Sequence, residues 1–165
     1  MSALTPRQLS STFCVHDNKI TMIKIRPHHL LDILRDYGNE VKRDFHPFGA
    51  SLKEITNDIL SDINQNIRLV SRVDSICVTC SKLENSICKA RINDDLLMRE
   101  YNDDLDDNLF DIMDISPGSE LSVRNFLEIV ENRMSSILTQ FSSPNNSPKV
   151  RETGTTIAIR KLSNR

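Results

Sequence analysis

Three cysteines between residues 77 and 88 constrain this 165-residue chain more than any other feature of its sequence. Cys77, Cys80 and Cys88 follow the pattern C-x2-C-x7-C. A C-x2-C pair on a tight turn directs two sulfur atoms at one point in space, and the third sulfur returns after the short loop 81–87. Thiolates are soft ligands that suit zinc and iron–sulfur clusters. The segment therefore predicts a loop folded around a metal centre.

The cysteines number one fewer than the four ligands that usually close such a centre. The fourth ligand would be a His, an Asp, an exogenous molecule or nothing. An iron that no Cys holds can bind a substrate or exchange ligands. Two other interpretations of the segment remain: unrelated thiols on a loop, or a redox dithiol at Cys77 and Cys80.

Two adjacent histidines, His28 and His29, follow Pro27, which fits the first turn of a helix because its missing N–H costs nothing there. Asp32 lies four residues after His28 and three after His29, within reach of both. A helix N-terminus favours neutral imidazole, the form that binds metal. The pair therefore offers a fourth ligand or a general acid–base, unless it only orients the helix end against a carboxylate. His46, in the loop sequence His-Pro-Phe-Gly, is a weaker candidate for the same role.

The spacing of apolar residues predicts an α+β fold, mainly helical, with about four helices, two or three short strands and the Cys-rich metal loop. Alternation of apolar and polar residues predicts strands over 20–25 and 67–73. Helical spacing predicts helices over 28–37, 50–64, much of the acidic stretch 94–114, and 123–141. Ser122 is the predicted N-cap of the last helix. The acids of 94–114 are expected to form a solvated face.

One domain is predicted over residues 20–141, flanked by two segments of different composition. Residues 1–19 form a polar extension that contains Cys14 and His16, outside the domain. Residues 142–165 form a linker rich in Ser, Pro and Asn and a basic tail. Within that tail, residues 155–162 are expected to be either an edge strand or a disordered basic end.

Charge and hydropathy exclude several classes of protein. The chain has 21 basic and 23 acidic residues, a formal net charge of −2, which argues against a general binder of nucleic acid. No apolar run approaches the roughly 20 residues that a membrane span needs. The N-terminus lacks the apolar core of a secretory signal. We therefore expect a soluble cytoplasmic protein with reduced thiols, where clustered cysteines more often bind metal than form disulfides.

Two parts of the chain together resemble a bacterial and archaeal family, domain of unknown function 1284. One is the sequence Ile-Arg-Pro-His-His-Leu-Leu at residues 25–31, and the other runs from Ile-Arg-Leu-Val at 67–70 through Asp-Ser-Ile-Cys at 74–77 to Cys80 and Cys88. The resemblance covers roughly residues 22–92, and members of the family are often labelled as iron–sulfur-binding. It implies that the three cysteines are cluster or metal ligands and that the two histidines belong to the site. Many relatives carry Cys at the position of Asp32, which makes Asp32 a candidate oxygen ligand.

The sequence thus supports several functions of different classes. The first is an iron–sulfur protein with Cys77, Cys80 and Cys88 on the cluster, His28 as first choice for the fourth ligand, Asp32 as alternative and His29 hydrogen-bonding to a ligand. The second is a zinc-binding structural or interaction module. The third, a zinc-dependent hydrolase or deaminase-like enzyme, lacks the usual H-E-x-x-H and H-x-E motifs. A redox partner or a small-molecule substrate fits these functions, and the sequence specifies neither a reaction nor an oligomeric state.

Overall fold

A small three-stranded sheet lies inside a mainly helical fold. The computed structural model describes residues 22–43, 46–141 and 147–165. The strands β1 (Ile23–Ile25), β2 (Asn66–Leu69) and β5 (Glu120–Ser122) lie in the order β1-β2-β5, with β1 parallel and β5 antiparallel to β2. Alternate residues of β2 point into the core, as the period of a strand requires. The central strand β2 therefore connects β1, near the start of the described chain, to β5 in its second half.

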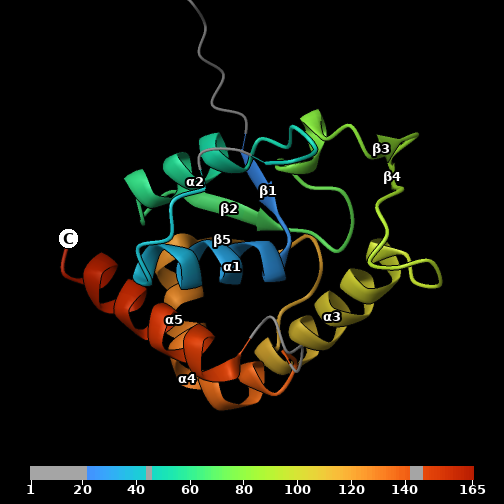
Figure 1. The fold of residues 1–165 in the computed structure, drawn as a ribbon. Helices are drawn as coiled ribbons and strands as arrows, with labels where there is room; N and C mark the ends of the chain where they lie inside the picture. The colour runs from blue at the N-terminus through green and yellow to red at the C-terminus, as the bar shows by residue number, and fades with distance from the viewer. Residues whose placement is uncertain (1–21, 44–45, 142–146) are drawn as a thin grey trace, which may run out of the picture.

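Five helices surround this sheet in the described parts of the chain. They are α1 (Pro27–Gly38), α2 (Leu52–Ser61), α3 (Met98–Met113), α4 (Val123–Leu138) and α5 (Pro148–Ser163). In Figure 1, α2 lies above β2, α1 lies below it, and α4 and α5 form the bottom of the molecule. None of these helices combines the length and apolar character that crossing a bilayer requires. The α+β prediction is confirmed, with five helices in place of about four.

Local sequence accounts for where several elements begin and end. Pro27 opens α1 at a position where a backbone N–H would have no partner. The Ser122 hydroxyl caps α4 by accepting the N–H of Asn125 at 3.1 Å, as predicted. Before β5 the chain turns through Gly118, whose φ of +91° suits glycine. The predicted strand 67–73 is shorter, at 66–69, and part of the strand 20–25 lies outside the described residues.

The core is apolar and continuous between the sheet and the helices. Its members are Ile, Leu, Val, Met, Phe and Ala side chains from β1, β2, all five helices and three loop positions, Ile63, Ile76 and Phe141. Ile25, Ile67 and Leu69 of the sheet are fully buried. A fold of this kind is held mainly by burial of apolar surface, at roughly 25 cal/mol per Å².

The structure of residues 155–162 contradicts both alternatives expected for them, an edge strand and a disordered basic end. These residues belong to α5, which packs along α1 and α4. The residues of its buried face recur at helical spacing: Arg151, Gly154, Thr155, Ala158, Ile159 and Leu162. Because Arg151, Gly154, Thr155 and Ala158 on this face are polar or small, apolar periodicity did not reveal the helix. Residues 148–163 are thus part of the folded body and not a loose basic tail.

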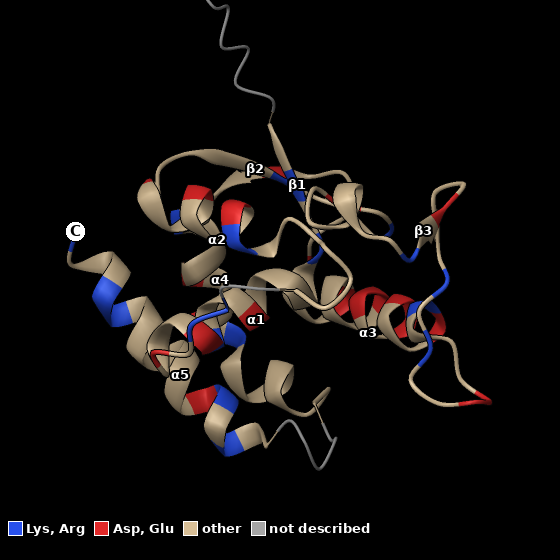
Figure 2. Ribbon diagram, turned by 45° about the horizontal axis from the view of Figure 1, so that its top comes forward, with Lys and Arg blue, Asp and Glu red and all other residues tan. Residues whose placement is uncertain are grey.

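The acidic stretch also differs from its prediction in one respect. Figure 2 shows the acids gathered along α3. Most of them lie in water, but Asp106 is fully buried and Asp103 is half-buried. Both face Arg26 at the junction of β1 and α1. The acidic helix is therefore only partly a solvated face, because it also supplies counter-charges to the start of α1.

Candidate metal centre

Three potential metal ligands, one from α1 and two from the loop after β2, meet at the N-terminal end of α1. His29 lies in the first turn of α1, Asp74 in the loop after β2, and Cys77 opens the short 3-10 helix η1 (Cys77–Thr79). One ligand atom from each lies within 4.8 Å of the others. Among the residues that the structure describes, this is the only such group of three. The Cys loop therefore does lie against the double-histidine end of α1.

Asp74 ties this junction together through four hydrogen bonds. Its Oδ2 accepts the backbone N–H of Arg26 at 3.0 Å and contacts Nδ1 of His29 at 2.7 Å. Its Oδ1 accepts the N–H groups of Ile76 and Cys77 at 3.1 and 3.2 Å. The carboxylate thus fixes the His29 ring and the backbone of the Cys77 turn at the same time.

The electrostatics of the group argue against a reactive thiol at Cys77. Burial raises the pKa of Cys77 to about 12, and the charge of Asp74 adds to this effect. Burial opposes ionisation of Asp74, but the charge and hydrogen bond of His29 outweigh it and lower the pKa of this carboxyl to about 2. A redox or nucleophilic cysteine needs a depressed pKa. Cys77 is therefore a protonated thiol that a bound cation would convert to a thiolate.

His28 faces away from the cysteines, toward α3. Its Nδ1 lies 2.9 Å from both carboxylate oxygens of Asp106, and its backbone N–H donates to Oδ1 of the same residue. Arg26 Nε donates to Asp106 at 2.5 Å. Burial, together with the charge of His29, lowers the pKa of His28. The first-choice fourth ligand thus contacts a buried ion pair, and its neighbour His29 is the histidine beside Cys77.

Asp32 and His46 occupy other positions around the site. Asp32 Oδ1 accepts hydrogen bonds from Arg35 at 2.9 Å and Arg151 at 2.6 Å, and Asp32 is not in the group of three ligands. Burial would raise the pKa of Asp32, but the two guanidinium groups lower it. His46 accepts the N–H of Phe48 through Nδ1 at 3.2 Å. Burial and the charge of His29 lower the pKa of His46.

Cys80 and Cys88 lie on the segment that leaves the site. The N–H of Cys80 donates to the Cys77 carbonyl at 2.9 Å, which closes the C-x2-C turn. Cys88, in β4 (Ile87–Cys88), pairs with Leu83 in β3 (Leu83–Glu84). All three thiols are half-buried and form no disulfide. Cys80 and Cys88 do not belong to the group of three ligand atoms around Cys77.

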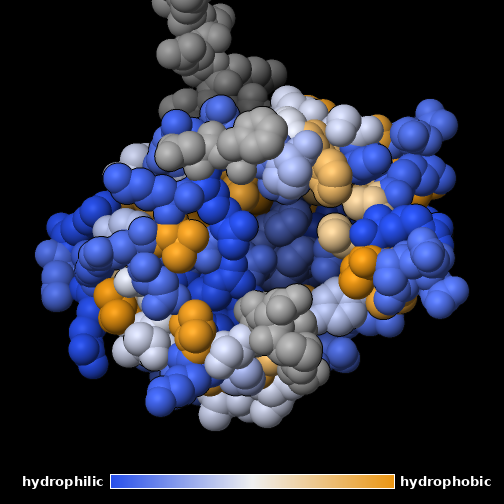
Figure 3. All heavy atoms as spheres, viewed as in Figure 1, coloured by the Kyte–Doolittle hydropathy of each residue, from blue (hydrophilic) through white to orange (hydrophobic). Residues whose placement is uncertain are grey.

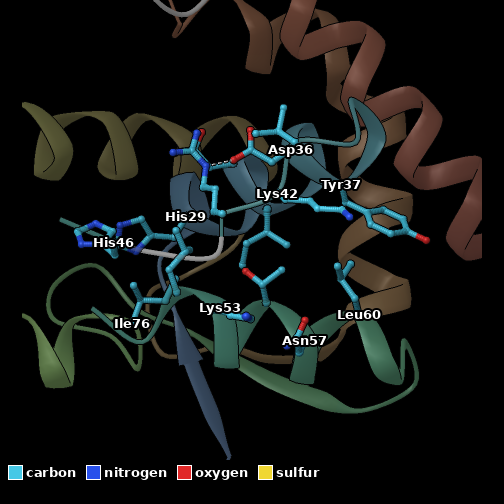
Figure 4. A pocket seen from close by; sticks show the side chains of 15 residues that line it. His29, Asp36, Tyr37, Lys42, His46, Lys53, Asn57, Leu60 and Ile76 are labelled. Atoms are coloured by element: carbon cyan, nitrogen blue, oxygen red, sulfur yellow. Dashed lines mark hydrogen bonds and ion pairs between the residues drawn. The ribbon is translucent and has the colours of Figure 1, made fainter. Parts of the chain in front are cut away.

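A pocket of about 340 Å³ begins at this group and runs between α1 and α2. Figure 3 shows that this face of the molecule is hollowed and that the floor of the depression is hydrophilic. In Figure 4, His29, His46 and Ile76 lie at one end and Tyr37 and Leu60 at the other. A molecule in the pocket would therefore lie beside His29, which is the one member of the ligand group that lines it.

Sequence reasoning missed two acids that organise the site. Asp74 was quoted only as part of the family resemblance, although an Asp two or three residues before backbone N–H groups of a turn is a known capping signal. Asp106 is hidden among the acids of α3, and no local signal separates it from them. Its role depends on contact with residues 26 and 28, some 80 positions earlier.

The part of the chain that matches a known family contains the Cys segment and the two helices after it. The family model described as "Protein of unknown function (DUF1284)" matches residues 46–142. The match includes Asp74 and the three cysteines, and it extends through α3 and α4, beyond the range of the resemblance seen in the sequence. Residues 25–31, with both histidines, lie before it. Searches of curated proteins and of solved structures gave no match. Because the family model covers more than half of the chain, the protein belongs to the DUF1284 family.

Proposed function

We propose that this protein binds a single transition-metal ion, of the zinc type, at His29, Asp74 and Cys77. The proposal depends on one observation, the approach of a nitrogen ligand from α1 and of an oxygen and a sulfur ligand from the loop after β2, all within 4.8 Å of one another. Zinc accepts all three atom types, with bond lengths of about 2.0 to 2.3 Å. The side chains would have to readjust around an ion, and His29 and Asp74 would separate from their contact at 2.7 Å. Three protein ligands with one open position are typical of catalytic rather than structural zinc sites.

The open position would face the pocket, because His29 is one of its lining residues. A bound ion would supply Lewis-acid chemistry to a molecule in the pocket. The binding and positioning of the ion would come from residues of the chain. The hydrogen bond between Asp74 and His29 holds these two ligands together in the absence of an ion, and the Cys77 thiol would give up its proton on metal binding.

Metal analysis of the purified full-length chain tests this proposal. About one zinc or iron per chain without acid-labile sulfide is expected, and His29→Gln and Cys77→Ser should each lose most of it. Cys88→Ser is the matched control and should retain the ion, because Cys88 is outside the group of ligands. Full metal content in His29→Gln and Cys77→Ser would refute the assignment.

An iron–sulfur cluster is the second candidate, and the Cys segment favours it. The sulfurs of such a cluster sit on separate iron atoms, so they lie farther apart than the ligands of one ion. The C-x2-C turn and the β3–β4 hairpin keep Cys77, Cys80 and Cys88 on one short, unbridged segment. A brown protein from anaerobic purification, with sulfide that disappears in Cys80→Ser and Cys88→Ser, would establish the cluster in place of the single ion.

A further inference from the structure

His46 lies at the same end of the pocket as His29 and is held there by contacts of its own. Both residues line the pocket, and Figure 4 shows their side chains together at one end. Burial, and then the charge of His29, lower the pKa of His46, so the two rings are close enough to interact. The His46 ring packs edge-on against Phe48, with 5.7 Å between the ring centroids. His46 therefore lies beside the candidate metal centre, although it is not one of the three grouped ligands.

A hydrogen bond to the backbone decides which ring nitrogen of His46 carries the proton. Nδ1 accepts the N–H of Phe48 at 3.2 Å, so the lone pair of this nitrogen is already used. A neutral imidazole has one proton, which must then be on the other nitrogen, Nε2. The lowered pKa of His46 agrees with a neutral ring. Nε2 is therefore a hydrogen-bond donor, and the ring has no free lone pair with which to bind a metal ion.

The opposite end of the pocket presents apolar surface. Tyr37 and Leu60 lie there, and Ile33 and Leu52 line the wall between α1 and α2. The Tyr37 hydroxyl already has a partner, because it accepts a hydrogen bond from Arg165 at 2.8 Å. Acidic and basic residues complete the lining. A donor at one end and apolar surface at the other, in a cavity of about 340 Å³, are typical of a small-molecule site.

We infer that His46 donates its Nε2–H to a carbonyl oxygen of the molecule that the pocket binds, and that this molecule is a small carbonyl compound with an apolar body. The body would lie toward Tyr37 and Leu60, at the end of the pocket away from His46. A carbonyl oxygen suits the site because it accepts an N–H donor and is polarised by a zinc-type ion. The contact with an ion beside His29 rests on the metal centre proposed above, whereas the contact with His46 does not.

The position of the proton on His46 is tested first, by NMR on the full-length protein. Long-range proton–nitrogen correlation spectra distinguish a protonated from an unprotonated ring nitrogen, and the signals of His46 are those that disappear in His46→Phe. At neutral pH, we expect an unprotonated Nδ1 and a protonated Nε2. The opposite tautomer would overturn the inference, because Nε2 would then be an acceptor.

Binding of a carbonyl probe tests the role of the donor. Benzohydroxamate carries a carbonyl oxygen next to an apolar ring and also binds zinc, and calorimetric titration of the zinc-loaded, full-length protein gives its affinity. His46→Phe keeps an aromatic ring but has no N–H, and it should weaken binding by about tenfold. His46→Gln, whose amide N–H can replace Nε2–H, is the matched control and should bind within about threefold of the parent. Equal affinity in His46→Phe and the parent, or an equal loss in both variants, would overturn the inference.

Zinc content measured on the same samples separates this inference from the metal proposal. Both His46 variants should keep the zinc of the parent, and loss of zinc in His46→Phe would overturn the inference by showing that His46 is a ligand. If the parent holds no metal, the metal proposal fails, and benzohydroxamate is titrated into the metal-free chain by NMR. A saturable shift of the His46 ring signals would still support the donor role, and unmoved His46 signals would refute it.

Discussion

Gly38 and Gly154 lie where α1 and α5 make their closest approach. A Cβ atom on Gly38 would come within 1.7 Å of the carbonyl oxygen of Gly154. A Cβ atom on Gly154 would meet the Arg35 carbonyl oxygen at 2.3 Å and the Asn39 side chain at 2.2 Å. Because the backbone atoms at this crossing cannot move independently, the two glycines set the distance between the helices.

Replacement of Gly154 by Ala is expected to lower the free energy of unfolding by about 2 kcal/mol or more, because the helices must separate. The direction of the change in the free energy of unfolding is informative, because Gly→Ala inside an uncrowded helix should stabilise the fold by about 1 kcal/mol. Urea denaturation measures the difference. Thr153→Ala, at an exposed position of the same helix, should change stability by no more than about 0.5 kcal/mol. A Gly154→Ala protein more stable than the parent would show that α5 does not pack on α1 as described.

The buried Asp106 should make the fold sensitive to acid. Burial opposes its ionisation, but the hydrogen bond and charge of His28 and the charge of Arg26 lower its pKa. The pKa in the unfolded chain is about 3.9, so the ionised carboxylate stabilises the fold above about pH 4. That contribution is lost as the pH falls through the lower, folded-state pKa.

Asp106→Asn should therefore cost about 3 kcal/mol at pH 7, because Arg26 loses a buried partner. The difference in the free energy of unfolding between variant and parent should narrow below about pH 4, where the parent carboxylate also becomes protonated. Denaturation curves between about pH 2 and pH 7 measure this difference in the free energy of unfolding. Asp107→Asn, at an exposed position of α3, should remain within about 0.5 kcal/mol of the parent throughout. A pH-independent gap would contradict the role given to the charge of Asp106.

Arg151 connects α5 to the pocket wall. Its guanidinium stacks 3.6 Å from the ring centroid of Phe141 and donates to Asp32 at 2.6 Å, with 1% of its side chain exposed. Arg151→Met keeps the apolar stem but removes the charge, and it should cost about 2 kcal/mol. The pKa of Asp32 should rise at the same time, because Arg151 is the largest influence that lowers it against burial.

Two measurements check the Arg151 prediction. Chemical denaturation gives the loss of stability, and carboxyl NMR titration gives the pKa of Asp32 in the variant. Arg160→Met, at an exposed position of the same helix, serves as the control and should change neither value. An unchanged pKa for Asp32 would show that Arg151 acts only through packing on Phe141.

Removal of a bound metal should leave the fold in place. The apolar core is formed by β1, β2 and the five helices and includes no side chain of the ligand group. Chelation should preserve the helical far-ultraviolet circular dichroism and lower the melting temperature, since a ligand at 100 times its Kd stabilises by about 2.7 kcal/mol. Loss of helicity on chelation would instead support the zinc-stabilised module.

Sequence patterns predicted the elements that have strong local signals. Pro27 and Ser122 mark helix starts, and their roles depend only on neighbours within a turn. Helix α5 escaped prediction because Arg151, Gly154 and Thr155 occupy buried positions where a pattern search expects apolar residues. Their burial depends on a partner helix more than 100 residues away in sequence, which local periodicity does not contain.

The candidate site was predictable in its residue types but not in its arrangement. Adjacent residues on a helix point about 100° apart, and His28 and His29 accordingly contact different carboxylates, Asp106 and Asp74. Which of them faces Cys77 depends on how α1 is rotated against α3, and Asp106 fixes that rotation by holding His28. Asp74 remained unassigned because its partners Arg26 and His29 lie more than 40 residues before it.

The middle position of β2 has a practical consequence for work on this family. Residues 46–142, the part that the family model matches, contain β2 and β5 but not β1. A fragment cut to those limits would leave one side of β2 with unpaired backbone groups, a template for intermolecular strand pairing and precipitation. Truncated versions intended for crystals or spectroscopy should therefore retain the segment from residue 22 onward.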